Sequence, residues 1–93
     1  MMKSVNGHDY AQAKEIIYED GRRELVSYTT TVIEITADGW MTVHGLYSRT
    51  TIKHIGWFMR EIGLTYQHAK MAYERRDIEQ FNVYTGEVKE VVA

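Results

Sequence analysis

Two adjoining stretches decide the fold: LVSYTTTVIEIT at residues 25–36 and WMTVHGL at residues 40–46, joined by ADG. The first has no Gly, Pro, Asn or Asp and is rich in β-branched residues, which favour extended backbone. We predict one long strand here, bent near the threonines. Asp38-Gly39 is typical of a tight hairpin turn, so residues 40–46 are expected to return as a second strand with Met41 and Val43 on one face.

The stretch before this core is less clear. Residues 1–10 are polar and are predicted to be a flexible lead-in. Residues 11–19 fit two structures, a helix capped by Asp9 with Gln12 or a strand that turns at Asp20-Gly21. The Asp-Gly pair between two apolar runs is the stronger local signal, so we favour the strand and hairpin.

After residue 46 the apolar period changes to that of a helix. Ser48 or Thr50 can cap its start and Gly63 can end it. At 100° per residue, one contiguous sector holds the apolar side chains Ile52, Ile55, Phe58, Met59 and Ile62. Gly56 lies at the edge of this sector, and we expect it to let the helix approach the sheet closely.

A second helix is predicted over residues 65–76, with inward side chains at Tyr66, Ala69, Ala72 and Tyr73. Residues 78–84 and 87–92 are then expected to form a C-terminal hairpin around Thr85-Gly86. The order gives an α+β fold class: an antiparallel β-meander followed by two helices packed on one sheet face, with a C-terminal β-hairpin. Residues 11–93 are expected to form a single domain.

Composition excludes several classes of protein. The chain has 93 residues, no Cys, 11 basic and 13 acidic residues, and a net charge of −2. Without Cys there is no disulfide framework, cysteine-ligated zinc site or thiol nucleophile. The near-balanced charge argues against a general nucleic-acid coat. No apolar run is long enough for a membrane span or a signal peptide, so we expect a soluble protein of a reducing compartment with no membrane partner.

Two segments resemble a known family: residues 24–30, ELVSYTT, and residues 45–55, GLYSRTTIKHI. They are similar to small uncharacterised proteins of bacteriophages, plasmids and integrated elements, mostly of Gram-positive bacteria, with an LvSYxT strand, a hairpin and then YSxTTxxHIxxF. The resemblance covers about residues 24–62, and the final aromatic falls at Phe58. The chain departs at Thr29-Thr30, where members often have a polar or acidic residue before Thr. The resemblance implies a mobile-element accessory protein in the cytoplasm of a bacterial host, with no activity or catalytic residue to carry over.

The start of the first helix supports two interpretations. Hydroxyl side chains and exposed backbone N–H groups at a helix start can seat an anion, and Arg49 and Lys53 would add positive charge. Alternatively, Ser48 or Thr50 only caps the helix and His54 bonds back to a strand. Arg49 and Lys53 lie where the helix dipole disfavours cations. Either these charges serve an external anion or acidic partner, or the helix simply tolerates them.

The outward side of the same helix is the second candidate surface. Trp57 lies about 140° from Ile52 on the helical wheel, opposite the apolar sector. Trp and Arg are the preferred residues of interface hot spots. We therefore predict a partner-binding set that consists of Arg49, Lys53, His54, Trp57 and Arg60. In the alternative, the second helix or the C-terminal hairpin covers Trp57 through Phe81, Val83 or Val91.

No motif predicts a catalytic site. The four histidines lack metal-ligand spacing, no serine has a nucleophile motif, and the glycines are scattered. We therefore expect no catalytic residue, metal or cofactor, and a protein that is not an enzyme. The leading hypothesis is an accessory protein that binds and modulates a host or phage protein, for example an inhibitor of a defence system such as an anti-CRISPR. One alternative is a small nucleic-acid-binding regulator that uses the same helix face with help from Lys70. The other is a self-associating structural subunit, such as a homodimer.

Overall fold

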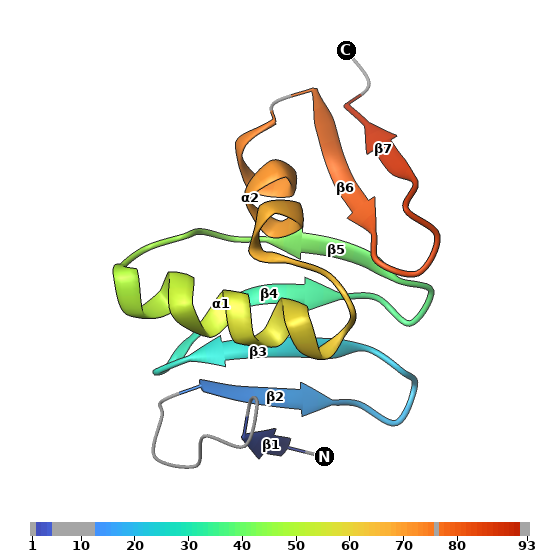
Figure 1. Cartoon of the computed structure of the whole chain (residues 1–93). Coiled ribbons are helices and arrows are strands. Elements are labelled where there is room, and N and C mark those ends of the chain that lie inside the picture. Colours follow the sequence, from blue (N-terminus) through green and yellow to red (C-terminus); the bar gives the residue numbers. More distant parts are fainter. Residues whose placement is uncertain (1, 5–12, 76, 92–93) are drawn as a thin grey trace.

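In the computed structural model, seven antiparallel strands form one sheet and follow each other in chain order (Figure 1). The model describes residues 2–4, 13–75 and 77–91. The strands are β1 (Met2–Ser4), β2 (Ala13–Ile17), β3 (Arg23–Ser27), β4 (Thr30–Ile35), β5 (Trp40–Val43), β6 (Ile78–Asn82) and β7 (Val88–Glu90). Helices α1 (Arg49–Glu61) and α2 (Tyr66–Glu74) lie between β5 and β6 in the chain.

Both helices cover the same face of the sheet. Helix α1 packs against β3, while α2 packs against β5 and β6, and the two helices contact each other. The side chains between helices and sheet form one apolar core, made of Ala13, Leu25, Val32, Ile33, Ile35, Met41, Ile55, Phe58, Met59, Ala69 and Phe81. This is the predicted α+β class, and the C-terminal hairpin β6–β7 extends the meander by pairing with β5.

The N-terminal part is more regular than the sequence predicts. Residues 13–17 are strand β2, as favoured over the helix, and Gly21 adopts a φ of +96° in the turn to β3. Met2–Ser4 form β1 and pair with β2, so the prediction of a flexible lead-in is wrong for these three residues. Pairing with β2 gives this short polar segment hydrogen-bond partners that a local sequence pattern does not reveal. The other residues of the lead-in lie outside the described part of the chain.

The single long strand predicted for residues 25–36 is also wrong. The chain reverses at Tyr28-Thr29, which separates β3 from β4. Tyr28 has a φ of +58°, a left-handed conformation that residues other than Gly, Asn and Asp rarely adopt. Because no turn-forming residue marks this position, β-branched residues on both sides make the segment look continuous. The register also shifts between Leu25 and Val26.

The β4–β5 turn is fixed by a contact with the C-terminal hairpin. Gly39 has a φ of +102° and its backbone carbonyl accepts from Val83 N at 2.8 Å. The buried amide of Asn82 donates from Nδ2 to the Asp38 carbonyl at 3.0 Å. Its Oδ1 accepts from the backbone N–H groups of residues 84 and 85 at 2.9 and 3.0 Å. Asn82 therefore ties the β4–β5 turn to the β6–β7 turn.

The helices follow their predicted apolar faces with one exception. In α1, Ile55, Phe58 and Met59 are fully buried, and Gly63 follows the helix with a φ of +84°. In α2, Ala69 is fully buried. Tyr73 is exposed in the last turn of α2, which ends at Glu74, so its predicted inward position is wrong.

The expected close approach at Gly56 is not found. A Cβ atom built on Gly56 would have no atom of the described residues within 4 Å, and Gly56 is not among the positive-φ glycines. Gly56→Ala is therefore expected to raise the free energy of unfolding by about 0.5–1 kcal/mol, because alanine loses less backbone entropy in a helix interior. Urea unfolding followed by circular dichroism measures this. A lower free energy of unfolding for Gly56→Ala than for wild type would show that residue 56 has no room for a side chain.

Candidate functional site

Helix α1 begins at a capped and unusually cationic end. Ser48 is the N-cap, and its Oγ accepts from Thr51 N at 3.3 Å. The first turn contains no acidic residue, whereas Arg49 and Lys53 are exposed near this end. Positive side chains at a helix N-terminus oppose the dipole. Capping by Ser48 is therefore as predicted, and the cations near it have no role in stabilising the helix end.

A chain of hydroxyl groups, buried at Ser27 and Thr51, fastens α1 to β3. Thr51 Oγ1 lies 3.3 Å from Ser48 Oγ and 3.3 Å from Ser27 Oγ. Ser27 Oγ lies 2.8 Å from His54 Nδ1. Since Ser27 and His54 are each only 2% exposed, the serine hydroxyl is not accessible to a substrate, and we assign the pair to holding the helix in place.

The structure corrects the position of His54. The sequence prediction places it on the outward face with the cations, but its side chain is buried and bonded to β3. The alternative interpretation, in which His54 bonds back to a strand, describes the structure. A hydrogen-bond partner from a distant strand determines the direction of this side chain, and a helical wheel does not contain that information.

Trp57 lies between the two positions predicted for it. Its side chain is half-buried and packs against the edge of the core. Its ring centroid is 5.6 Å from that of His54, and the ammonium group of Lys53 lies 5.2 Å from the Trp57 ring centroid. The next ring beyond His54 is that of Tyr28, at 5.8 Å. Trp57 thus joins a row of rings that runs from Tyr28, in the β3–β4 turn, to the exposed ammonium group of Lys53.

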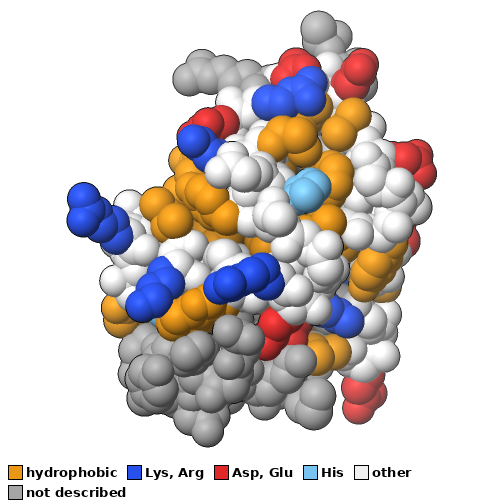
Figure 2. Space-filling view, viewed as in Figure 1, with side chains coloured by type: hydrophobic (Ala, Val, Ile, Leu, Met, Phe, Trp, Pro, Cys, Tyr) orange, Lys and Arg blue, Asp and Glu red, His pale blue; other side chains and the backbone are white. Residues whose placement is uncertain are grey.

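The remaining predicted residues are exposed. Arg49, Lys53 and Arg60 all point to solvent from α1, and Figure 2 shows blue Lys and Arg side chains along this side of the molecule, next to orange hydrophobic surface. We call Arg49, Lys53, Trp57 and Arg60 the α1 basic face. Four of the five predicted binding residues therefore reach the surface at least in part, and His54 lies beneath them.

Two exposed tyrosines near this face are not in the predicted binding set. Tyr28 and Tyr47 are 54% and 64% exposed and have positive φ values of 58° and 38°. Strained backbone in a residue other than glycine is often retained at binding sites. The Tyr47 ring covers Gly45, where an added Cβ would lie 2.7 Å from Tyr47 Cζ. The available signal was the general enrichment of tyrosine at interfaces.

His54 is expected to make the folding stability of the protein depend on pH. Burial, and then the charge of Lys53, lower the pKa of His54 below its usual value. Below about pH 6.5 the unfolded chain therefore binds a proton that the folded protein does not. Stability is complete above this pH and is expected to fall as the pH decreases from about 6.5 towards the folded-state pKa. Urea unfolding between pH 7.5 and 5 measures how the free energy of unfolding changes with pH.

The matched variant for this prediction is His54→Asn, which keeps a polar atom near Ser27 but does not titrate. The variant is expected to be less stable at pH 7.5 and to have a flatter pH dependence. Carboxylates with lowered pKa values, such as Asp20, Asp38 and Asp77, act at lower pH and are common to both proteins. Equal slopes between pH 7.5 and 5 would show that His54 is not responsible.

The described residues contain no group of three or more His, Cys, Asp or Glu side chains able to hold a metal ion. Among them, no helix combines the length and apolar character needed to cross a membrane.

Comparison with known proteins adds a family assignment. The model of DUF8033, a family of unknown function, matches residues 3–80. Comparisons with the curated proteins and with the solved structures gave no match. The matched range includes β2 to β5, both helices and the α1 basic face. The chain therefore belongs to the DUF8033 family of proteins of unknown function.

Proposed function

We propose that this protein works by stoichiometric contact with an acidic partner protein, through the α1 basic face, and modulates that partner without catalysing a reaction. The supporting observation is the set of three exposed cations, Arg49, Lys53 and Arg60, beside the half-buried Trp57. Arg49 and Lys53 lie near the N-terminal end of α1, where cations oppose the helix dipole. Arginine next to a partly exposed aromatic ring matches the composition of interface hot spots.

The setting of this function is also proposed. The pattern shared with proteins of bacteriophages and other mobile elements suggests an accessory protein that acts in the cytoplasm of a bacterial host. The partner would then be a host or phage protein, and a component of a defence system, as for an anti-CRISPR, is one concrete case. An inhibitor of this kind needs a rigid surface and no cofactor, and the hydroxyl chain that fastens α1 supports such rigidity.

A nucleic-acid-binding regulator is the second candidate. The same cations can contact phosphates, and the exposed rings of Tyr28 and Tyr47 can stack on bases. Self-association is less favoured at this face, because a two-fold dimer through it would bring Arg49, Lys53 and Arg60 of one copy against those of the other. Sedimentation that shows a monomer at high concentration would remove the homodimer.

The experiment compares two charge-matched double variants. Arg49→Gln/Lys53→Gln removes two charges from the α1 basic face, and Lys70→Gln/Arg75→Gln removes two from α2 and the residue after it. The wild-type protein is first used to capture and identify a partner from a bacterial host lysate. The α1 variant is expected to bind the purified partner at least tenfold more weakly, and the α2 variant about as well as wild type. Trp57→Ala is expected to weaken binding similarly.

Two results would contradict the proposal. Equal affinity of both double variants and Trp57→Ala for every captured partner would exclude the α1 basic face. Binding to a random DNA duplex that decreases steeply with salt, and that is lost in the α1 variant, would move the function to the nucleic-acid class.

A further inference from the structure

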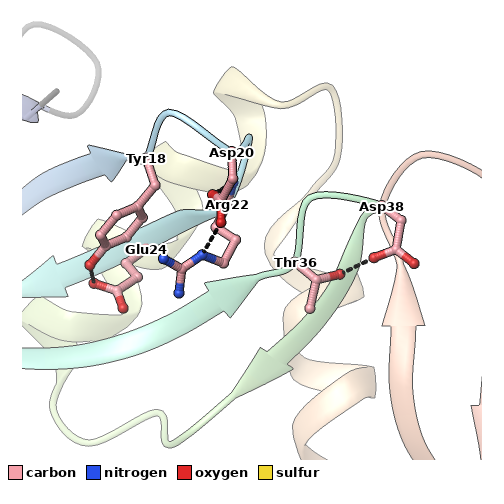
Figure 3. A network of polar contacts seen from close by, with 6 residues as sticks. All are labelled: Tyr18, Asp20, Arg22, Glu24, Thr36 and Asp38. Carbon is pink, nitrogen blue, oxygen red and sulfur yellow. Dashed lines mark hydrogen bonds and ion pairs between the residues drawn. The ribbon is translucent and has the colours of Figure 1, made fainter.

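The face of the sheet opposite the helices contains a pocket of about 220 Å³. Its lining comes from the β2–β3 hairpin and from β4 and β5, and comprises Tyr18, Arg22, Arg23, Glu24, Glu34, Ile35, Thr36, Trp40 and Thr42. Figure 3 shows part of it, with the Tyr18 and Arg22 side chains in front of the strands and the helices behind. The pocket is separate from the α1 basic face, which lies on the helix side.

Two carboxylates stand next to each other on the floor of this pocket. Glu24 and Glu34 are direct cross-strand partners, and Thr42 follows opposite Glu34. Like charges that face each other across two strands destabilise a sheet. The Glu24 carboxylate accepts from the Tyr18 hydroxyl at 2.9 Å, and Glu34 contacts the His44 imidazole, which is charged only when protonated.

The arginines of the pocket are already matched by other carboxylates. Arg22 Nε donates to Asp20 Oδ2 at 2.8 Å, outside the pocket lining. Arg23 Nη1 lies 3.7 Å from Glu15 Oε2, a buried carboxylate. Asp20 and Glu15, which are not among the lining residues, offset the charges of Arg22 and Arg23, although the Arg22 guanidinium itself lies over the Tyr18 ring. Glu24 and Glu34 then leave a net negative charge in the lining, which attracts a cation.

The walls of the pocket are aromatic rings that already hold cations of the chain itself. The Arg22 guanidinium lies 4.5 Å from the Tyr18 ring centroid, and the Lys89 ammonium lies 4.5 Å from that of Trp40. Both cations are on exposed side chains, which a ligand can displace. The hydrogen bond to Glu24 raises the pKa of Tyr18, which keeps its hydroxyl protonated as a donor.

We propose that this pocket binds an arginine side chain from an exposed segment of a partner protein, with the guanidinium over Glu24 and Glu34 and against Tyr18 or Trp40. Guanidinium is planar, donates two parallel hydrogen bonds to carboxylates and stacks on aromatic rings. An ammonium group offers a point charge without these two features. The unfavourable Glu24–Glu34 pairing is explained if the ligand separates and neutralises the two carboxylates.

The test uses the full chain with Trp57→Phe, so that Trp40 is the sole tryptophan. The probes are three capped peptides: N-acetyl-Gly-Arg-Gly-amide, the same peptide with citrulline, and the same with lysine. Citrulline keeps the shape of arginine and removes its charge. The arginine peptide is expected to change Trp40 fluorescence in a saturable way and to bind at least tenfold more tightly than the citrulline peptide and more tightly than the lysine peptide.

Glu24→Gln and Glu34→Gln test whether the two pocket carboxylates bind the guanidinium. Glu87→Gln, in the β6–β7 turn, is the matched control. Glutamine can still accept the hydrogen bonds from Tyr18 and His44. Each pocket variant is expected to lose at least tenfold in affinity for the arginine peptide while its urea midpoint stays the same or rises. Glu87→Gln is expected to keep the affinity. A stability loss accompanying the affinity loss would indicate a structural role only.

Three outcomes would overturn the proposal: no saturable Trp40 response, equal binding of the arginine and citrulline or lysine peptides, or unchanged affinity in both pocket variants. None of these depends on the α1 basic face. Arg49→Gln/Lys53→Gln is expected to bind the arginine peptide as well as its parent, so failure here and failure of the proposed function are distinguishable.

Discussion

Gly39→Ala is expected to lower the free energy of unfolding by about 3 kcal/mol. Two effects contribute. The φ of +102° at Gly39 is unfavourable for an L-residue by about 1–2 kcal/mol. A Cβ here would also lie 2.5 Å from Tyr84 Cδ2 and 2.7 Å from Asn82 Oδ1, and overpacking of this kind typically adds about 1–3 kcal/mol. The exposed Tyr84 ring can rotate away, but Asn82 is held by three hydrogen bonds.

Gly86→Ala separates these two effects. Gly86 has a φ of +80°, but no atom of the described residues lies within 4 Å of a Cβ built on it. This variant should therefore show only the backbone effect, about 1–2 kcal/mol. Urea unfolding of both variants gives the comparison. Equal losses would mean that the turn of Gly39 tolerates a side chain and that Asn82 does not hold the two hairpins rigidly together.

Phe58→Ala is expected to have the largest effect on stability, about 3–5 kcal/mol. Phe58 is fully buried on α1 and is the largest of the fully buried side chains in the described part of the chain. Removing its ring leaves a cavity between α1 and the sheet. Since a domain of this size has a total stability of about 5–15 kcal/mol, a substantial unfolded fraction is expected at 37 °C. Thermal unfolding followed by circular dichroism measures the loss.

Ile52→Ala is the matched control for Phe58→Ala. Ile52 is on the same helix but half-buried, so part of its side chain is already in contact with water. Ile52→Ala should therefore lower the free energy of unfolding clearly less than Phe58→Ala does. If Phe58→Ala cost less than Ile52→Ala, helix α1 would not be anchored where the structure has it, and the position of the α1 basic face would need revision.

The parts of the fold that were predictable carry a local chemical signal. Asp20-Gly21 and Asp38-Gly39 mark turns, and Ser48 and Gly63 mark the ends of α1, because glycine and hydroxyl residues have conformational preferences of their own. The turn at Tyr28-Thr29 was not predictable, since the strands on both sides impose a left-handed conformation on a tyrosine.

The candidate site divides in the same way. The exposure of Arg49, Lys53 and Arg60 follows from helical periodicity alone. The burial of His54 depends on Ser27, which is 27 residues away in the chain. The pocket on the opposite face depends on the register that places Glu24 opposite Glu34. Neither contact leaves a pattern in adjacent residues, so only the assembled sheet reveals them.

The strand order of the sheet has a consequence for how the protein folds. Every strand pairs with its predecessor in the chain, so β1 to β5 can pair while the segment that becomes α1 is still being synthesised. The longest connection between two paired strands is residues 44–77, which contain both helices and join β5 to β6. Loop closure over short distances is entropically inexpensive, and folding rates rise as contacts become more local. We therefore expect the docking of the two helices, which brings β6 to β5, to be the slowest step of folding.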